Sequence, residues 1–288
     1  MCRLFGLLAA HDESAEQWLV HSDRSLLAQS NVSPDTAQKD GWGIGWFEDG
    51  GRVRVEKGTG GAYEAAERDR YLQAARDAKG TLIFGHLRHA SNPLHLVRER
   101  LIALENSQPF EAHTTIFAHN GSIPFPMETR PFLGVHEPKV RGVNDSEVLF
   151  WLLYRNTEET GDPLVAYIRT VEDLVRVWQG LKRPPVPPFS GLNMLFSRGP
   201  NELWAFCQWT GDHGSGLIDT SRRYYEMTYQ ASPQRVIVGS EPFDGEPGAW
   251  KSLSSGSYLV ARRNERHVEL KVGKIPLPTA LEIRPPPA

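Results

Sequence analysis

A cysteine directly follows the first methionine, and this position gives Cys2 two groups that can act together. A small side chain at position 2 permits removal of Met1, so that the mature chain would begin with cysteine. Its thiolate is a nucleophile, and its free α-amine, with an ordinary pKa of about 7.7–8.0, suits a general base at neutral pH. Taken alone the position is weak support, because a cysteine found directly after the first methionine is usually there by chance.

The pair Asn120-Gly121 follows an apolar segment, residues 114–118, that we expect to be a β-strand. An Asn-Gly pair after a strand is ordinarily a turn. The same pair also offers the Asn120 side-chain amide and the Gly121 main-chain N–H as neighbouring donors. Two such donors can hold the oxyanion of a tetrahedral intermediate, which is the functional alternative.

Arg88 closes another apolar segment, residues 81–88, and therefore needs a nearby anion, because a buried unpaired guanidinium is costly. A protein carboxylate is the ordinary partner. A substrate carboxylate is the alternative, since arginine binds carboxylates through two parallel hydrogen bonds.

Residues 144–147 precede an apolar helix that we expect to begin at Asp145. Either Asp145 or Ser146 would cap this helix by accepting main-chain N–H bonds. Asp145 can instead accept hydrogen bonds from a substrate ammonium. A free amino acid has a carboxylate, an ammonium and, in some cases, a reactive side-chain carbonyl. Arg88, Asp145 and the Asn-Gly pair supply one complement to each, with Cys2 as the attacking group.

The elements that must position these residues are strands near both ends of the chain and helices between them. We expect helices over residues 63–78, from Asp145 onward and over residues 164–181, and a long loop over residues 122–143. We expect strands over residues 2–10, 40–47, 53–55, 81–88, 114–118, 192–196, 203–207, 224–229, 235–238, 257–262 and 268–272. This order suggests an α+β fold of two sheets with helices outside them, in one domain spanning residues 1–288.

Composition and charge limit the classes of binding partner that we expect for this chain. The 288 residues are 40% hydrophobic and 23% charged, with a net charge of -3, and lysines and arginines are spread along the chain. We therefore expect no nucleic-acid partner. No apolar run approaches the roughly 18 residues of a membrane span, so we expect no membrane association. Two cysteines imply no disulfide framework and favour a cytoplasmic location, with Cys207 a small core residue.

Two other interpretations are weaker. The apolar run after Arg3 is shorter than a secretory signal and favours a buried strand. Five histidines could suggest a metal site, but their spacing fits no standard cluster, and strand alternation places the first two on opposite faces. We expect neither a metal nor a cofactor. These histidines are His86, His89, His95, His113 and His119.

The chemically interesting segments resemble, in the same order, those of the class II glutamine amidotransferases, which are N-terminal-nucleophile (Ntn) hydrolases. The resemblance covers about the first 150 residues. The start and the Asp-Gly-Trp-Gly segment look most like stand-alone members, which include the YafJ-like proteins and the γ-glutamyl hydrolase of ergothioneine synthesis. The segments that carry the resemblance are residues 1–6, 40–46, 85–91, 106–110, 119–121 and 144–147.

The resemblance implies a four-layer αββα sandwich of two antiparallel sheets. It implies Cys2 as nucleophile with its own amine as base, and Asn120 with Gly121 as the oxyanion hole. It also implies that Arg88 binds the substrate α-carboxylate, that Ser91 assists it, and that Asp145 binds the α-amino group. The chain departs from well-known members after the arginine, where Trp-Ala-Thr-His-Gly is replaced by His-Ala-Ser-Asn-Pro.

The function predicted is hydrolysis of the side-chain amide of glutamine or a γ-glutamyl compound through a thioester on Cys2, releasing glutamate. The length leaves no room for an attached synthase domain, so one alternative is a glutaminase subunit that passes ammonia to a separate synthase. The other alternative is a non-catalytic binding or regulatory protein that retains the fold.

Overall fold

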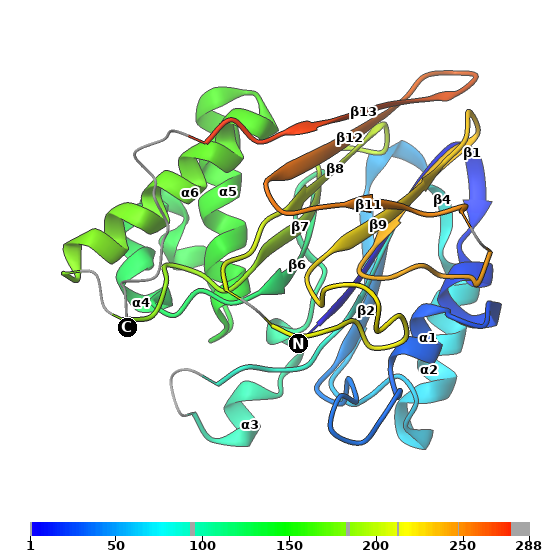
Figure 1. The fold of residues 1–288 in the computed structure, drawn as a ribbon, viewed down its shortest axis with the longest axis horizontal. Coiled ribbons are helices and arrows are strands. Elements are labelled where there is room, and N and C mark those ends of the chain that lie inside the picture. The colour runs from blue at the N-terminus through cyan, green and yellow to red at the C-terminus, as the bar shows by residue number, and fades with distance from the viewer. Residues whose placement is uncertain (1, 93–95, 183–184, 212, 247, 278–288) are drawn as a thin grey trace.

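The computed structural model describes residues 2–92, 96–182, 185–211, 213–246 and 248–277. Within these ranges, two antiparallel sheets pack face to face and helices cover both outer surfaces (Figure 1). Helices α1 and α2 lie against one sheet, and α5 and α6 lie against the other. The predicted α+β class and the αββα layer order are therefore confirmed.

The first sheet has the strand order β11-β9-β10-β1-β4-β2-β3. Its central strand β1 is covered on both faces, which explains the unbroken burial from Arg3 to Ala10 and the apolar run in the sequence. The strands are β1 (Arg3–Ser14), β2 (Trp42–Phe47), β3 (Val53–Gly58), β4 (Lys79–Leu87), β9 (Met227–Ala231), β10 (Arg235–Gly239) and β11 (Lys251–Leu253).

The second sheet has the strand order β13-β12-β8-β7-β6-β5. Its buried strands are β-branched, aromatic and apolar, as expected for strands packed on both faces. The strands are β5 (Phe110–Ala112), β6 (Thr115–Gly121), β7 (Leu192–Ser197), β8 (Glu202–Cys207), β12 (Ser257–Arg263) and β13 (Val268–Lys274).

The long helices start and stop at clear sequence signals. Asn144 caps α5, Gly161 ends it in the left-handed conformation, and Asp162 caps α6 ahead of a proline in its first turn. The helical segments are η1 (Gln17–His21), α1 (Leu26–Gln29), η2 (Asp49–Gly51), α2 (Ala65–Asp77), α3 (Arg98–Leu101), η3 (Leu104–Asn106), α4 (Pro126–Thr129), η4 (Arg130–Lys139), α5 (Asp145–Thr160) and α6 (Pro163–Gly180).

Three buried clusters lie between successive layers. The middle cluster fills the space between the sheets and contains Cys207, which is fully buried. Cys207 is therefore a core residue, as predicted. Burial raises the pKa of its thiol to about 12. Among the described residues, no helix combines the length and apolar character needed to cross a membrane.

Several predicted boundaries are wrong. Residues 122–143 are not one long loop, because α4 and η4 occupy most of them. Pro126 and Pro131 do not prevent these helical turns, because both lie in first turns, where a missing N–H costs nothing. The strand predicted over 224–229 is β9, which begins later, at Met227. The three-residue strands β5 and β11 were not predicted.

The main chain at Gln108 crosses directly over β2, and this contact requires a glycine at position 43. A Cβ atom on Gly43 would lie 2.1 Å from the Gln108 carbonyl oxygen, a main-chain atom that has no side-chain freedom to move away. By contrast, a Cβ atom on Gly180, at the end of α6, would meet nothing within 4 Å.

We therefore expect Gly43→Ala to lower the free energy of unfolding by about 1–3 kcal/mol, the usual cost of overpacking. Gly180→Ala is the matched control, and it should leave stability unchanged or slightly raised. Urea denaturation measures both. Equal midpoints for the two variants would contradict the close approach.

Candidate active site

Three of the segments singled out in the sequence meet at one end of the first sheet. Arg3 pairs with Leu87 on β4, and Leu87 pairs with Trp42 on β2, so the residues just beyond these strand ends lie in a row. The row continues past the strands, since the Arg88 N–H donates to the Gly41 carbonyl at 2.8 Å. Cys2 is thereby placed beside Arg88.

Cys2 is half-buried, and its thiol contacts the main chain of the next segment. Its Sγ lies 3.7 Å from the His89 carbonyl oxygen, and the Tyr224 hydroxyl donates to the Cys2 carbonyl at 3.4 Å. Burial raises the pKa of the Cys2 thiol, while the His89 hydrogen bond and the Arg88 charge partly oppose that rise. A neighbouring base is therefore needed to generate thiolate at neutral pH. Met1 lies outside the described residues.

Arg88 is buried without a carboxylate partner. Its Nη1 donates to the carbonyl oxygens of Asp40 and Leu101, at 3.1 and 3.0 Å, and no carboxylate lies within 4.0 Å in the described part of the chain. Burial lowers the pKa of Arg88, and the charges of Cys2, Asp40 and Asp145 oppose this. The guanidinium retains donors for an external anion.

Asn120 lies at the end of β6 with its side chain fully buried, and neither its Oδ1 nor its Nδ2 has a hydrogen-bond partner among the described residues. The adjoining Gly121, the last residue of β6, lies so close to the start of the neighbouring strand β7 that a Cβ atom would fall 1.8 Å from the Gly191 carbonyl oxygen. A buried amide without partners is costly, so Asn120 is held ready to bind something absent from the chain.

Asn120 and Gly121 form a corner, called the Asn-Gly corner, that is held in place by the hydrogen bonds of the preceding residue, His119. Gln108 bonds both main-chain groups of His119: its Oε1 accepts from the N–H at 2.6 Å, and its Nε2 donates to the carbonyl at 3.2 Å. The His119 ring donates from Nε2 to the Gly191 carbonyl at 3.1 Å, which leaves Nδ1 to accept from the Ser146 hydroxyl at 2.9 Å. Burial lowers the pKa of His119, consistent with this neutral form.

Asp145 does not cap α5, contrary to one of the sequence alternatives, and neither does Ser146. The cap is Asn144, whose Oδ1 accepts from the Glu147 N–H at 2.8 Å. Asp145 instead accepts the Ile123 N–H through Oδ2 at 2.7 Å, and no cation lies within 4.0 Å of it among the described residues.

Ser91 lies near Asp145, since both line one small cavity together with Asn144 and Leu101. The Leu101 carbonyl is also a hydrogen-bond acceptor for Arg88. The charges of Arg88 and Asp145 act on Cys2, and Ser91 shares a small cavity with Asp145. Asn120 and Gly121 lie just before Ile123, whose N–H binds Asp145, so this pair adjoins the same group of residues.

Asn106 is a positioning residue whose role the sequence interpretation missed. Its Oδ1 accepts from the Val143 N–H at 2.8 Å, and its carbonyl accepts from the Asn144 side chain at 2.7 Å. Its Nδ2 donates to the Leu101 carbonyl at 3.1 Å. Asn106 therefore joins the loop under Arg88 to the start of α5. Segment 106–110 was recognised in the resemblance, but without a physical role.

A second missed group links Cys2 to a segment from the far end of the chain. Glu241 accepts the consecutive main-chain N–H groups of residues 217–219, and the buried Arg3 guanidinium lies 3.4 Å from its carboxylate. Arg3 also lies under the Tyr224 ring, 4.2 Å from its centroid. The sequence signal for this contact was an arginine within a buried strand, because Arg3, like Arg88, needs an anion nearby.

The same segment brings Tyr225 to the site. Its hydroxyl lies 3.2 Å from Ser190 Oγ, and its ring packs on Gly191, next to the Asn-Gly corner. Burial raises the pKa of Tyr225 to about 12, and the charges of Cys2 and Asp145 add to the rise. Tyr225 is therefore a neutral wall of the site at physiological pH. In Figure 1 this segment, coloured yellow ahead of β9, passes beside the start of β1.

The histidines do not form a metal centre in the described part of the chain, where no group of three or more His, Cys, Asp or Glu side chains is arranged to hold a metal ion. His86 is fully buried, and burial lowers its pKa to about 3, with Arg88 adding to the effect. His113 lies in a surface turn between β5 and β6. His95 lies outside the described residues.

Known proteins share this fold, and one family model covers most of the chain. A family model described as class-II glutamine amidotransferases matches residues 1–276. A search of curated proteins finds no match. A glutamine aminotransferase class-II domain protein from Silicibacter pomeroyi superposes with a TM-score of 0.62 at 17% identity, covering 94% of this chain and 98% of its own. The glutamine phosphoribosylpyrophosphate amidotransferase from B. subtilis superposes with a TM-score of 0.57 at 17% identity, covering 96% of this chain and 50% of its own.

The contacts of Glu241 predict that it anchors residues 217–219, and removal of its charge tests this role. Glu241→Gln removes the charge that balances Arg3 and weakens acceptance of three N–H groups. We expect a loss of about 3 kcal/mol in unfolding free energy and faster hydrogen exchange at the amides of residues 217–219. The control is Glu265→Gln, which changes an exposed carboxylate. Unchanged exchange at those three amides would refute the anchoring role.

Proposed function

The chain belongs to the class-II glutamine amidotransferases, and on this premise we propose that it hydrolyses the side-chain amide of glutamine or of a γ-glutamyl compound through a thioester on Cys2. The observation that supports the proposal is that the charges of Arg88 and Asp145 act on that thiol, while the Asn-Gly corner adjoins Asp145. Within the described chain, Arg88 lacks a carboxylate partner, Asp145 lacks a cation partner, and the side-chain amide of Asn120 lacks a hydrogen bond.

The three groups complement the amino-acid end and the reactive carbonyl of such a substrate. The α-carboxylate would bind the remaining donors of Arg88, with the Ser91 hydroxyl as a further donor. The α-ammonium would bind Asp145, whose second oxygen has no hydrogen bond to the described chain. The side-chain carbonyl would then point to the Asn-Gly corner.

The reaction begins with removal of Met1, which frees the α-amine of Cys2. That amine takes the thiol proton, and the sulfur attacks the amide carbonyl carbon to form a tetrahedral intermediate. The Asn120 Nδ2 and the Gly121 N–H donate to the oxyanion. The protonated amine passes its proton to the leaving nitrogen, the C–N bond breaks, and ammonia or an amine departs.

Hydrolysis of the thioester completes the cycle. The α-amine of Cys2 takes a proton from water, whose oxygen attacks the thioester carbonyl. The same donors at Asn120 and Gly121 hold the second oxyanion. The C–S bond then breaks, the thiolate recovers its proton from the amine, and glutamate leaves. No step requires a metal or a redox cofactor.

We place this reaction in the cytoplasm. Both cysteines are free thiols, and the mechanism requires the half-buried Cys2 to remain reduced. A reducing compartment meets that requirement.

Replacement of the nucleophile is the direct test. Cys2→Ala should abolish glutamate release from glutamine and from γ-glutamyl amides, because no other group can form the thioester. Cys207→Ala, which changes the second cysteine within the core, should retain activity. The assay is glutamate release by purified protein, with intact mass confirming removal of Met1. Equal rates for wild type and Cys2→Ala would remove the proposal.

The role of Arg88 is tested by changing enzyme and substrate together. Wild type should prefer glutamine to its α-carboxamide analogue by about 10²-fold, given that a charge-assisted bond is worth roughly 1.5–3 kcal/mol. Arg88→Met should lose this preference mainly by a rise in KM for glutamine. If the variant still discriminated against the α-carboxamide, the carboxylate would bind elsewhere.

A further inference from the structure

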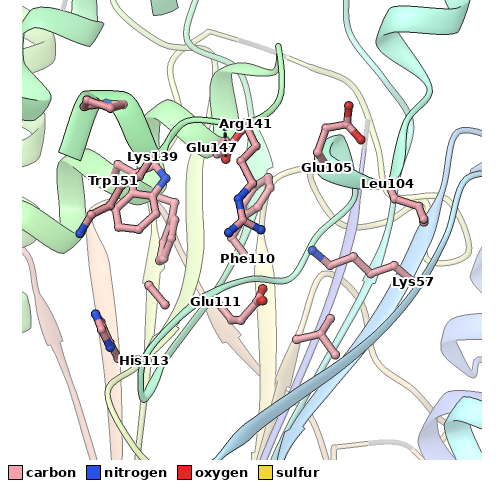
Figure 2. A pocket seen from close by; sticks show the side chains of 14 residues that line it. Lys57, Leu104, Glu105, Phe110, Glu111, His113, Lys139, Arg141, Glu147 and Trp151 are labelled. Carbon is pink, nitrogen blue, oxygen red and sulfur yellow. Dashed lines mark hydrogen bonds between the residues drawn. The ribbon is translucent and has the colours of Figure 1, made fainter.

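A second cavity, of about 650 Å³, lies where one edge of each sheet meets the start of α5 (Figure 2). Edge strand β3 of the first sheet and edge strand β5 of the second form two of its walls, and residues 138–141 form a third. None of the residues assigned to the candidate active site lines it. Its volume is in the range of small-molecule sites, and the catalytic proposal makes no use of it.

Charged side chains of both signs line this cavity without pairing with one another. Five of them form no hydrogen bond or ion pair within 4.0 Å through their charged atoms in the described part of the chain. These are Lys57, Lys139, Arg141, Glu105 and Glu111. Side chains that face one space with opposite charges would ordinarily pair across it.

Glu147 differs from these five, because its carboxylate is already satisfied. It accepts the N–H groups of Arg141 and Gly142 at 2.9 and 2.6 Å, respectively. These bonds fix the main chain at Arg141. Glu147 therefore forms a rigid part of the wall and determines the position from which the Arg141 side chain extends.

Lys57 is the least solvated of the unpaired charges. Its ammonium lies 5.4 Å from the centroid of the Phe110 ring. Burial lowers the pKa of Lys57, Glu111 and Glu147 oppose this, and Arg141 adds to the lowering. A partly desolvated cation beside a second cation is stabilised by an anion bound between them.

Figure 2 shows the side chains of Lys57, Arg141 and Glu111 pointing toward the same space from three segments. We propose that this cavity binds a zwitterion of amino-acid type, a free amino acid or a short peptide. Its carboxylate would lie between Lys57 and Arg141, and its ammonium would bind Glu111. A simple anion would leave Glu111 repelled, and a simple cation would leave the two basic groups uncompensated.

Three related probes separate these ligand classes. L-alanyl-L-alanine carries both charges, its N-acetyl derivative only the carboxylate, and its C-terminal amide only the ammonium. Isothermal titration of the full chain should give saturable binding of the dipeptide. Each singly charged derivative should bind at least about tenfold more weakly, because one charge-assisted bond is lost.

Variants then locate the site. Lys57→Met and Glu111→Gln should each weaken dipeptide binding about tenfold or more. Both changes remove a charge that forms no ion pair or hydrogen bond in the described part of the chain, so the fold is not at risk, and circular dichroism checks this. Lys271→Met, on an exposed part of β13, is the control that should bind as wild type does.

Arg88→Met separates this cavity from the active site and keeps the result independent of the catalytic proposal. Dipeptide binding that survives Arg88→Met but not Lys57→Met supports the inference. Loss of binding in Arg88→Met alone would assign the dipeptide to the active site and overturn it. Equal binding of the N-acetyl derivative, or no saturable binding, would also overturn it.

Discussion

The constraint on which this structure depends is the burial of polar groups whose hydrogen-bonding capacity the described part of the chain does not fill. Arg88, Asp145 and the Asn120 side chain are withdrawn from water, and each retains unused hydrogen-bonding capacity within the described chain. The charges of Arg88 and Asp145 act on Cys2. Such groups cost free energy unless a ligand satisfies them. One molecule with a carboxylate, an ammonium and an amide carbonyl can satisfy all three, and an amino acid with an amide side chain has these groups.

The surrounding hydrogen bonds explain how such groups stay in place. Gln108 holds the main chain ahead of Asn120, and Asn106 joins the loop under Arg88 to the cap of α5. Glu241 holds the segment that leads to Tyr224 and Tyr225, and its charge balances that of Arg3. These supports come from both sheets, so the site requires the whole sandwich.

Much of the fold was predictable because its signals are local. Continuous apolar runs indicated the buried strands, and an amphipathic pattern over residues 164–181 indicated α6. The short strand β5 was missed because its three residues carry no period, and the prolines of residues 126–138 concealed helical turns. The sequence indicated the residues proposed to bind substrate, because their chemistry is specific. It missed the supports Asn106 and Glu241, whose roles depend on long-range contacts that no spacing reveals.

Direct observation of the acyl-enzyme tests the central claim. Protein mixed with glutamine or a γ-glutamyl amide, quenched in acid within one turnover and digested, would be analysed by mass spectrometry of the amino-terminal peptide. The account predicts a peptide that begins at Cys2 and carries one γ-glutamyl group on sulfur, which disappears as glutamate forms. Glutamate release with that peptide unmodified throughout, or with Met1 still attached, would contradict it.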